Sequence, residues 1–276
     1  MFASRQITSL NGPKTADQWS IEHQKDLLDY ANQQEHITLS NPSHFQTIFR
    51  GDFSISIWTR VVEGQLGGAV RHIFSYKNAG TGGDSLTISI STTGLPNGVI
   101  WFGMANGIDT QYNYTVDPYL LPDGDTGWIH LVVSAGFSSG LKVIKDGEIW
   151  RDQALLSAMS AETWGLMTCS AAPAILAKNN NGTLESGVGG QVSDFAIYNK
   201  ALDYNEALEI YNNREAFDHT DWRSGHHCKG WWRFGDEEAF TTSIDAPVFD
   251  HSGNGITGTL SSMDQGDIEP ESPGDI

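Results

Sequence analysis

The sequence predicts an all-β protein in which two antiparallel sheets pack face to face. Three observations support this fold class. Short segments in which apolar and polar residues alternate recur along the chain, as in strands that bury one face. Turn-forming residues separate these segments, and glycine alone contributes 30 of the 276 residues. A single short segment, residues 203–213, has the clear pattern of a helix, so helices are expected to be a minor part of the fold.

The clearest strand pair lies within residues 127–150. Its first strand alternates two sets of side chains, Trp128, His130, Val132 and Ser134 against Ile129, Leu131 and Val133. The polar loop 136–140 leads to a second strand, 141–145. Asp146-Gly147 then supplies a tight turn, because glycine adopts a positive φ at little cost. We therefore expect this hairpin to lie at the centre of a sheet.

Further strands are expected before this pair, at 35–39, 53–60, 71–76, 85–91, 99–104 and 111–116. A short helix or turn is expected ahead of the first strand, within 21–40, and Asn41-Pro42 is expected to stop that strand. The predicted core comprises Phe53, Ile55, Ile57, Leu131, Val133 and Ile197. Three strand tryptophans, Trp58, Trp101 and Trp128, are also expected to be core residues.

After the hairpin, strands are expected at 174–177 and 191–198, followed by the helix at 203–213. Asp203 is placed to cap the amides of the first helical turn. Glu206 follows three residues later, as in a capping box. The apolar side chains of the helix are Ala207, Leu208, Ile210 and Tyr211. They supply one mostly apolar face.

Three blocks of sequence resemble laminin-G-like, concanavalin A-like jelly-roll domains, and they occur in that family's order. They are the hairpin WIHLVVS…GLKVIKDGE within residues 128–148, the strand Phe53–Trp58, and the late strand with its following turn, Gly190–Leu202. The resemblance implies that residues 21–213 form a two-sheet antiparallel jelly-roll sandwich. Residues 1–20 are then an N-terminal arm.

Residues 214–276 differ in composition and contain the tryptophan-rich segment 229–262. Within it, the stretch 249–260 resembles the segment that usually opens a laminin-G-like unit. Burying each large aromatic side chain is worth roughly 1.5–3 kcal/mol, so the segment is expected to pack as strands. It packs on its own sandwich or on a neighbour, and the first is favoured because the jelly roll otherwise lacks this piece at its start. The acidic end beyond Gly266 is expected to be extended or mobile.

The acidic composition disfavours some partners. The formal net charge is −18 and the pI is near 4.6, so a phosphate backbone would be repelled and nucleic-acid binding is disfavoured. No apolar run reaches the length of a membrane span or a signal-peptide core, so neither membrane insertion nor signal-dependent export is expected. Cys169 and Cys228 could form a disulfide or stay separate. Two cysteines in this length of chain make no disulfide framework.

One candidate metal site is the sequence Asp250-x-Ser252-x-Asn254, which places three oxygen ligands at alternate positions of a glycine-rich loop. Calcium takes six to eight oxygen ligands, and such loops can supply several. The motif lacks the full calcium-loop spacing and its terminal glutamate. A polar turn held by Asx hydrogen bonds is therefore the competing interpretation. Three other loop aspartates are candidates of the same kind, Asp84, Asp123 and Asp125.

Aromatic and sulfur-containing residues give two more candidate sites. Trp231 and Trp232 could stack on a sugar ring, but adjacent residues of a strand point to opposite faces. At most one of them is then exposed on a given side, and core packing is the competing role. His226, His227 and Cys228 suggest zinc or a reactive thiol. A structural zinc site needs four ligands, so surface histidines beside a packed cysteine are the alternative.

Catalytic patterns are not found. The resembled fold includes glucanases that use a pattern like Glu-x-Asp-x-x-Glu on a strand, where a retaining mechanism needs two carboxyl groups about 5 Å apart. No strand here carries that pattern, and Glu237-Glu238 are consecutive. Neither a nucleophile elbow nor a phosphate loop is visible. The sequence therefore predicts a protein that is not an enzyme.

We predict a non-enzymatic virion structural or decoration protein of a capsid or tail, with a lectin-like fold that contacts glycans. The virion prediction comes from the arrangement of the sequence blocks, which is similar to that of proteins from marine tailed phages. The alternatives are a secreted bacterial carbohydrate-binding module, which would be extracellular, and a degenerate glycoside hydrolase. Expected partners are other virion proteins, copies of the same chain, and cell-surface or environmental glycans. Calcium is the one cofactor expected.

Overall fold

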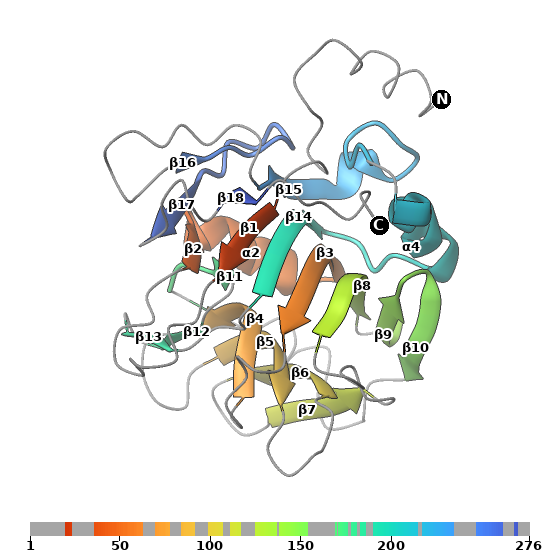
Figure 1. Cartoon of the computed structure of the whole chain (residues 1–276). Coiled ribbons are helices and arrows are strands. Elements are labelled where there is room, and N and C mark those ends of the chain that lie inside the picture. The colour runs from red at the N-terminus through yellow and green to blue at the C-terminus, as the bar shows by residue number, and fades with distance from the viewer. Residues whose placement is uncertain are drawn as a thin grey trace.

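The computed structural model confirms the predicted fold class (Figure 1). It describes residues 20–23, 36–62, 70–77, 84–91, 99–106, 111–116, 125–136, 138–153, 169, 171–175, 178–180, 183–185, 190–214, 217–234, 247–261 and 268–269. Two large antiparallel sheets form a sandwich, and side chains from both sheets meet in one hydrophobic core between them. Among the described residues, no helix is long and apolar enough to cross a membrane.

The first sheet contains the predicted hairpin, which lies toward one edge of the sheet and not at its centre. The strands of this sheet, in order, are β10 (Glu148–Gln153), β9 (Gly140–Lys145), β8 (Asp125–Gly136), β3 (Phe53–Val62), β14 (Gly190–Tyr198), β1 (Ser20–His23) and β18 (Ile268–Glu269). A further strand, β15 (Cys228–Arg233), also pairs with β14. The edge of β14 is shared between two parts of the chain, because β1 pairs with its residues 190–192 and β15 with its residues 194–198.

The second sheet combines early strands with the tail. Its order is β16 (Pro247–Val248), β17 (Gly258–Ser261), β2 (His36–Leu39), β11 (Ala174–Ile175), β4 (Val70–Lys77), β5 (Asp84–Ser91), β6 (Val99–Asn106) and β7 (Gln111–Val116). Two short strands, β12 (Lys178–Asn180) and β13 (Thr183–Glu185), pair separately. Because β15 pairs with β14 and β17 with β2, the tail segment packs on its own sandwich and enters both sheets.

The helix expected near 203–213 is present as α4 (Tyr204–Tyr211). The Asp203 side chain accepts a hydrogen bond from the Glu206 amide, and the Glu206 side chain accepts one from the Asp203 amide, so the capping box is confirmed. A left-handed Asn212 follows α4 and leads into the 3₁₀ turn η4 (Asn212–Arg214).

A second helix, α2 (Pro42–Phe49), was not predicted, so the expectation of a single helix is wrong. Proline at the first helical position is well tolerated, because the amide it lacks would have no partner within the helix. Pro42 therefore begins a helix where it was expected only to stop a strand. Near the N-terminus, residues 20–23 form a strand, whereas a helix or turn was one expectation for 21–40; residues 24–35 lie outside the described part.

The inner core, defined as the cluster between the two sheets, contains all six predicted core residues. Phe53, Ile55, Ile57, Leu131, Val133 and Ile197 are each at most 1% exposed. The unpredicted α2 also faces this core with Phe45, Ile48 and Phe49. The aromatic rings are in mutual contact, as in the edge-to-face pair Phe49–Phe53. The strand tryptophans Trp58 and Trp128 are buried as predicted, while the side chain of Trp101 lies outside the description.

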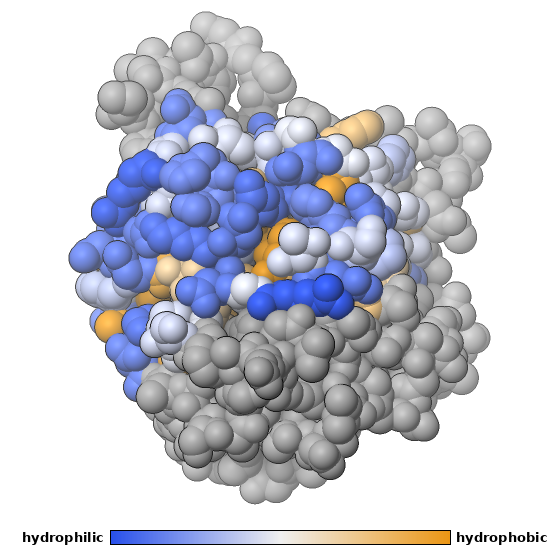
Figure 2. Space-filling model, turned by 180° about the vertical axis from the view of Figure 1, so that it is seen from behind, coloured by the Kyte–Doolittle hydropathy of each residue, from blue (hydrophilic) through white to orange (hydrophobic). Residues whose placement is uncertain are grey.

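A second cluster, which we call the outer core, buries the other face of the first sheet. Its members are Val132, Ile144, Ala196, Tyr198, Leu202, Ala207, Ile210, Phe217, Cys228 and Trp231. The covering residues come from α4 and from the segment 217–231 that follows it. Both faces of β3, β8 and β14 are therefore buried. The described surface seen in Figure 2 is mostly hydrophilic, with small hydrophobic patches.

Candidate functional site

The predicted site residues gather on β15 and on the turn that follows it in space, residues 249–255, which we call the tail turn. Trp232 forms an isolated antiparallel bridge with Asp250, and the His251 amide donates to the Trp231 carbonyl. The tail turn therefore lies directly beside β15. Sequence alone placed these residues in one segment, and the pairing of two short backbone stretches brings them into contact.

The two adjacent tryptophans point to opposite faces, as predicted from strand geometry. Trp232 belongs to the inner core and is fully buried, with its ring against Phe45 and Phe195. Its indole nitrogen donates to the Ile256 carbonyl at 2.8 Å. This hydrogen bond ties the end of the tail turn to the core. In this position Trp232 has no exposed face on which a sugar could stack.

Trp231 belongs to the outer core and is 6% exposed. Its indole nitrogen donates to Asp194 Oδ1 at 2.6 Å. The rings of His219 and His251 and the guanidinium of Arg233 surround it at 5.4, 5.5 and 5.8 Å. The core role that competed with sugar stacking therefore describes both tryptophans as the structure places them.

A buried polar network continues inward from Trp231. Asp194 Oδ2 lies 2.8 Å from His219 Nε2, and His219 Nδ1 lies 2.5 Å from the Tyr198 hydroxyl. All three side chains are at most 3% exposed. Burial is the main cause that raises the pKa of Tyr198 well above its ordinary value. An aspartate beside a histidine often marks a catalytic site, but solvent has no access to this one, so its role here is to join β14 to segment 217–231.

The Asp250 carboxylate organises the tail turn. Its Oδ1 accepts hydrogen bonds from the amides of Trp231 and Ser252 at 3.1 and 2.8 Å, and its Oδ2 accepts one from the Ile256 amide at 3.1 Å. The Asn254 side chain donates to Ser252 Oγ at 2.9 Å. These contacts are those of the polar turn that competed with a calcium loop in the sequence analysis.

Calcium binding stays a prediction for this turn. The three amide donors already occupy both oxygens of Asp250, so a cation there would compete with the hydrogen bonds that form the turn. Within the described residues, no three His, Cys, Asp or Glu side chains group as a metal site. The side chains of the other candidates, Asp84, Asp123 and Asp125, lie outside the description.

The two cysteines are free and buried, so the disulfide alternative is not realised. Their thiols donate to the carbonyls of Tyr76 and Gly230, respectively. Burial is the main cause that raises the pKa of Cys228 far above its ordinary value, so its thiol is poorly nucleophilic. His226 and His227 stack at 4.0 Å, and His227 Nδ1 contacts Asn199 Oδ1. These histidines therefore lie beside a packed cysteine, which is the arrangement that the sequence analysis gave as the alternative to a metal site.

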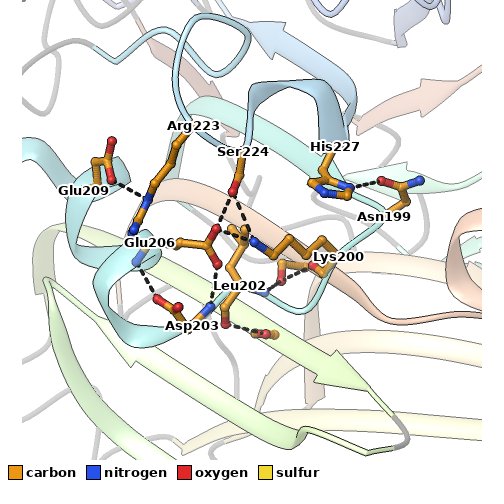
Figure 3. Close-up of polar contacts among 11 residues, drawn as sticks. Asn199, Lys200, Leu202, Asp203, Glu206, Glu209, Arg223, Ser224 and His227 are labelled. Atoms are coloured by element: carbon orange, nitrogen blue, oxygen red, sulfur yellow. Dashed lines mark hydrogen bonds and ion pairs between the residues drawn. The ribbon is translucent and has the colours of Figure 1, made fainter.

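A second polar cluster fastens α4 to the following segment, and Figure 3 shows its side chains pointing toward one another. Lys200 Nζ lies 2.5 Å from Glu206 Oε1, and the Ser224 hydroxyl donates to the same oxygen. Burial works to raise the pKa of Glu206. The hydrogen bonds from Lys200, Ser224 and the Asp203 amide outweigh burial, so the pKa lies below its ordinary value of 4.5. Glu206 is thus held as a structural carboxylate.

One serine–histidine pair forms that the sequence did not indicate. Ser56 Oγ lies 2.9 Å from His130 Nε2 across β3 and β8. Burial is the main cause that lowers the pKa of His130 from 6.5 to about 3, and the nearby charge of His219 adds to it. The imidazole contacts the rings of Trp58 and Tyr211, which also contact each other. A fully buried pair is a packing element, since a substrate cannot reach it.

What the site offers to solvent is therefore limited to its rim. Phe249 is 47% exposed, Asn254 is exposed, and His251 and Lys229 are half-buried. An exposed aromatic ring can contact the C–H face of a sugar, and amide, imidazole and ammonium groups can contact its hydroxyl groups. Asn254 is the rim residue that the sequence analysis named, as a candidate calcium ligand. Phe249 belongs to the tryptophan-rich segment whose large aromatic side chains were expected to be buried, and its exposure corrects that expectation.

No family model matches the chain, and no curated protein matches it. Solved structures, in contrast, match the chain. The CBM40 domain of the IT-sialidase from Ruminococcus gnavus is 14% identical with a TM-score of 0.53, over 70% of this chain and 96% of that one. A putative carbohydrate-binding protein from Bacteroides ovatus is 14% identical with a TM-score of 0.56, over 92% of this chain and 60% of that one. These likenesses show the fold alone, a two-sheet jelly-roll sandwich.

Proposed function

We propose that this chain is a non-enzymatic glycan-binding domain. The observation that carries the proposal is the likeness to the CBM40 domain, which extends over 96% of that domain. Structures of that domain were determined with α2,3- and α2,6-sialyllactose bound. The buried carboxylates of Asp194 and Glu206 support a non-catalytic role. Each is engaged in hydrogen bonds that hold the tail layer, and neither reaches solvent.

Titration calorimetry with defined glycans tests this function. Sialyllactose of both linkages and lactose form the first comparison, because they separate recognition of an acidic sugar from recognition of the neutral core. The rim contributes through Phe249, so Phe249→Ala is expected to weaken binding. Leu208→Ala, which truncates another exposed apolar side chain at a distance in sequence, is the matched control. A glycan array on which the chain binds nothing would overturn the proposal.

We further propose that the domain is displayed on a virus particle. This rests on the order of the sequence blocks described above, with the family's opening segment at the end of the chain. The tail enters both sheets of its own sandwich, which suits a self-contained displayed domain. Co-purification of the chain with intact particles is the expected result. A gene neighbourhood without capsid or tail genes, beside a catalytic domain, would favour a secreted bacterial carbohydrate-binding module.

A further inference from the structure

The tail turn contains the dipeptide Asn254-Gly255, and its geometry points to a chemical modification. We propose that Asn254 deamidates spontaneously in the folded protein, giving aspartate and isoaspartate at this position. Both residues are exposed to solvent. The reaction needs only water, which reaches them freely. The proposal concerns the chain itself and stands independently of any glycan.

The nucleophile would be the backbone nitrogen of Gly255. Within the described part of the chain, this amide donates no hydrogen bond, so no acceptor holds its proton. Gly255 lies at φ +71°, and a Cβ built on it would meet nothing within 4 Å. The space beside the Gly255 Cα is therefore open. A residue with a side chain at this position would both strain the backbone and obstruct the attack.

The atoms balance without any further reactant. The deprotonated Gly255 nitrogen attacks Asn254 Cγ, the Cγ–Nδ2 bond breaks, and ammonia leaves with the displaced proton. The product is a five-membered cyclic imide. Water then adds to one of its two carbonyls. Addition at Cγ restores the normal backbone and gives aspartate. Addition at the backbone carbonyl carbon leaves the chain running through the side chain and gives isoaspartate.

The product would alter the contacts of the turn. Asn254 Nδ2 donates to Ser252 Oγ at 2.9 Å and to the Cys228 carbonyl at 3.4 Å. A carboxylate has no hydrogen to donate, so both bonds are lost and two acceptors face each other at Cys228. The new negative charge also lies in the same turn as the Asp250 carboxylate. Deamidation therefore weakens the attachment of the tail turn to β15, beside the rim that carries Phe249.

Ageing of the purified full-length chain at mildly alkaline pH tests the proposal. The peptide containing position 254 is expected to gain the mass of an amide-to-acid exchange and one negative charge, and to become a substrate for isoaspartyl methyltransferase. The same incubation of the chain in denaturant gives the rate without the fold. Asn254→Gln is the matched variant, because its longer side chain would have to close a six-membered ring and is expected to lose the modification.

The remaining outcomes decide the question. Four other Asn-Gly pairs occur, with their asparagines at positions 11, 97, 106 and 181, so the mass change is assigned by peptide and not from the whole chain. Modification at 254 in the folded chain, absent from Asn254→Gln with an unchanged melting temperature, supports the proposal. A 254 peptide that stays an amide in the folded chain while it deamidates in denaturant would overturn it, because the turn would then protect the site.

Discussion

The two cores on either side of the first sheet differ in chemistry. The inner core, between the sheets, is built from apolar side chains and a few aromatic groups that hydrogen-bond to backbone carbonyls, such as Trp232 and Tyr76. The apolar side chains of the outer core are accompanied by buried ionisable groups, namely Asp194, His219 and Glu206. Each of these groups is paired. Burial alone can hold the inner core together, whereas the outer core also needs specific partners.

This difference in chemistry between the two cores explains how the tail is attached in one position. Apolar burial is non-directional, so it favours covering the first sheet without dictating which segment covers it. The hydrogen bonds that the Asp194 carboxylate accepts from the Trp231 indole N–H and makes with His219 Nε2 can form in only one register of β15 and one position of segment 217–231. A buried polar group without its partner is costly, so alternative placements are disfavoured. The inner core thus contributes most of the stability, and the hydrogen bonds of the outer layer select one arrangement of the tail on the first sheet.

Removing the tail is expected to have the largest effect, because the tail belongs to both cores. Deletion of residues 229–276 takes away β15, β17 and both tryptophans, and it exposes an edge of β14 and of β2. We expect aggregation or loss of cooperative unfolding, measured by light scattering and thermal melting. Deletion of residues 270–276 alone is the control. A soluble deletion variant with the parental melting temperature would reduce the tail to an appendage.

The inner core is tested next by Trp232→Ala. The ring is fully buried, and large-to-small substitutions of this kind cost about 3–5 kcal/mol of the free energy of unfolding. Urea denaturation measures this directly. Phe249→Ala is the control, because Phe249 lies in the same tail segment but is exposed. Truncating it is expected to change the free energy of unfolding by no more than about 0.5 kcal/mol. Equal effects of the two would contradict the placement of Trp232.

The outer core is tested by Trp231→Phe, which keeps an aromatic ring and removes the indole N–H. The Asp194 oxygen that accepts this N–H at 2.6 Å is left short of a partner in a buried place, at a cost of about 1–3 kcal/mol. Trp222→Phe removes a similar indole donor, 3.0 Å from the His219 carbonyl, from a half-buried residue. We expect the smaller loss there. The reverse order would mean that the Asp194 network contributes little.

Acidification is expected to weaken the outer core selectively. The pKa of His130 is about 3 in the folded chain and 6.5 ordinarily. At pH values between these two, the imidazole is protonated in the unfolded chain and neutral in the folded chain. Stability therefore falls as the pH drops through that window. The Glu206 pKa is lowered below 4.5, so its contribution is present above 4.5 and is lost as the pH falls further.

Urea denaturation at a series of pH values separates the two groups. His130→Gln is expected to flatten the pH dependence of the free energy of unfolding between about pH 6.5 and 4.5, where the histidine dominates. Glu206→Gln is expected to act only below that range. If both variants retain the parental slope, titration of the outer core does not control stability, and the contrast between the cores is purely structural.

The smallest effect is expected at the solvent side of the outer layer. Arg223 Nε lies 2.8 Å from Glu209 Oε2, but the two side chains are 50% and 38% exposed. An ion pair in water contributes about 0.2–1 kcal/mol and is screened by salt. Glu209→Gln should therefore lower the melting temperature slightly in dilute buffer and not at all in high salt. A loss that persists in high salt would indicate a contact beyond charge pairing.

The inner core was readable from the sequence because its strands alternate strictly and its turns carry Asp-Gly or Gly signals. The helix α4 was readable because Asp203 and Glu206 form a local motif. The helix α2 was missed because Pro42 serves equally well to end a strand and to begin a helix. Local signals that have a single meaning were therefore predictable, and those with two meanings were not.

The candidate site was only partly predictable for a different reason. Trp231 and Trp232 were named as sugar-stacking candidates but are buried, and the calcium role of Asp250 stays a prediction. The hydrogen-bond partners of the two tryptophans come from far away in sequence. Asp194 is the partner of Trp231, and Ile256 is the partner of Trp232. The exposed rim, with Phe249 and His251, carries no motif of its own. Both faces of β15 are covered, one by the inner core and the other by segment 217–231, and periodicity within β15 does not indicate that second covering.

The pairing of β17 with β2 has a consequence for how the protein is made. Ile37, near the beginning of the chain, lies opposite Leu260, near its end. A ribosome adds about 5–20 residues per second. Most of the chain is therefore synthesised after β2 and before β17, its neighbour in the sheet. The hydrogen-bonding edge of β2 is then an open template for other nascent chains. The cell that produces this protein therefore has to shield an unfinished sheet until the last strands emerge, and yield will depend on translation speed and chaperone supply.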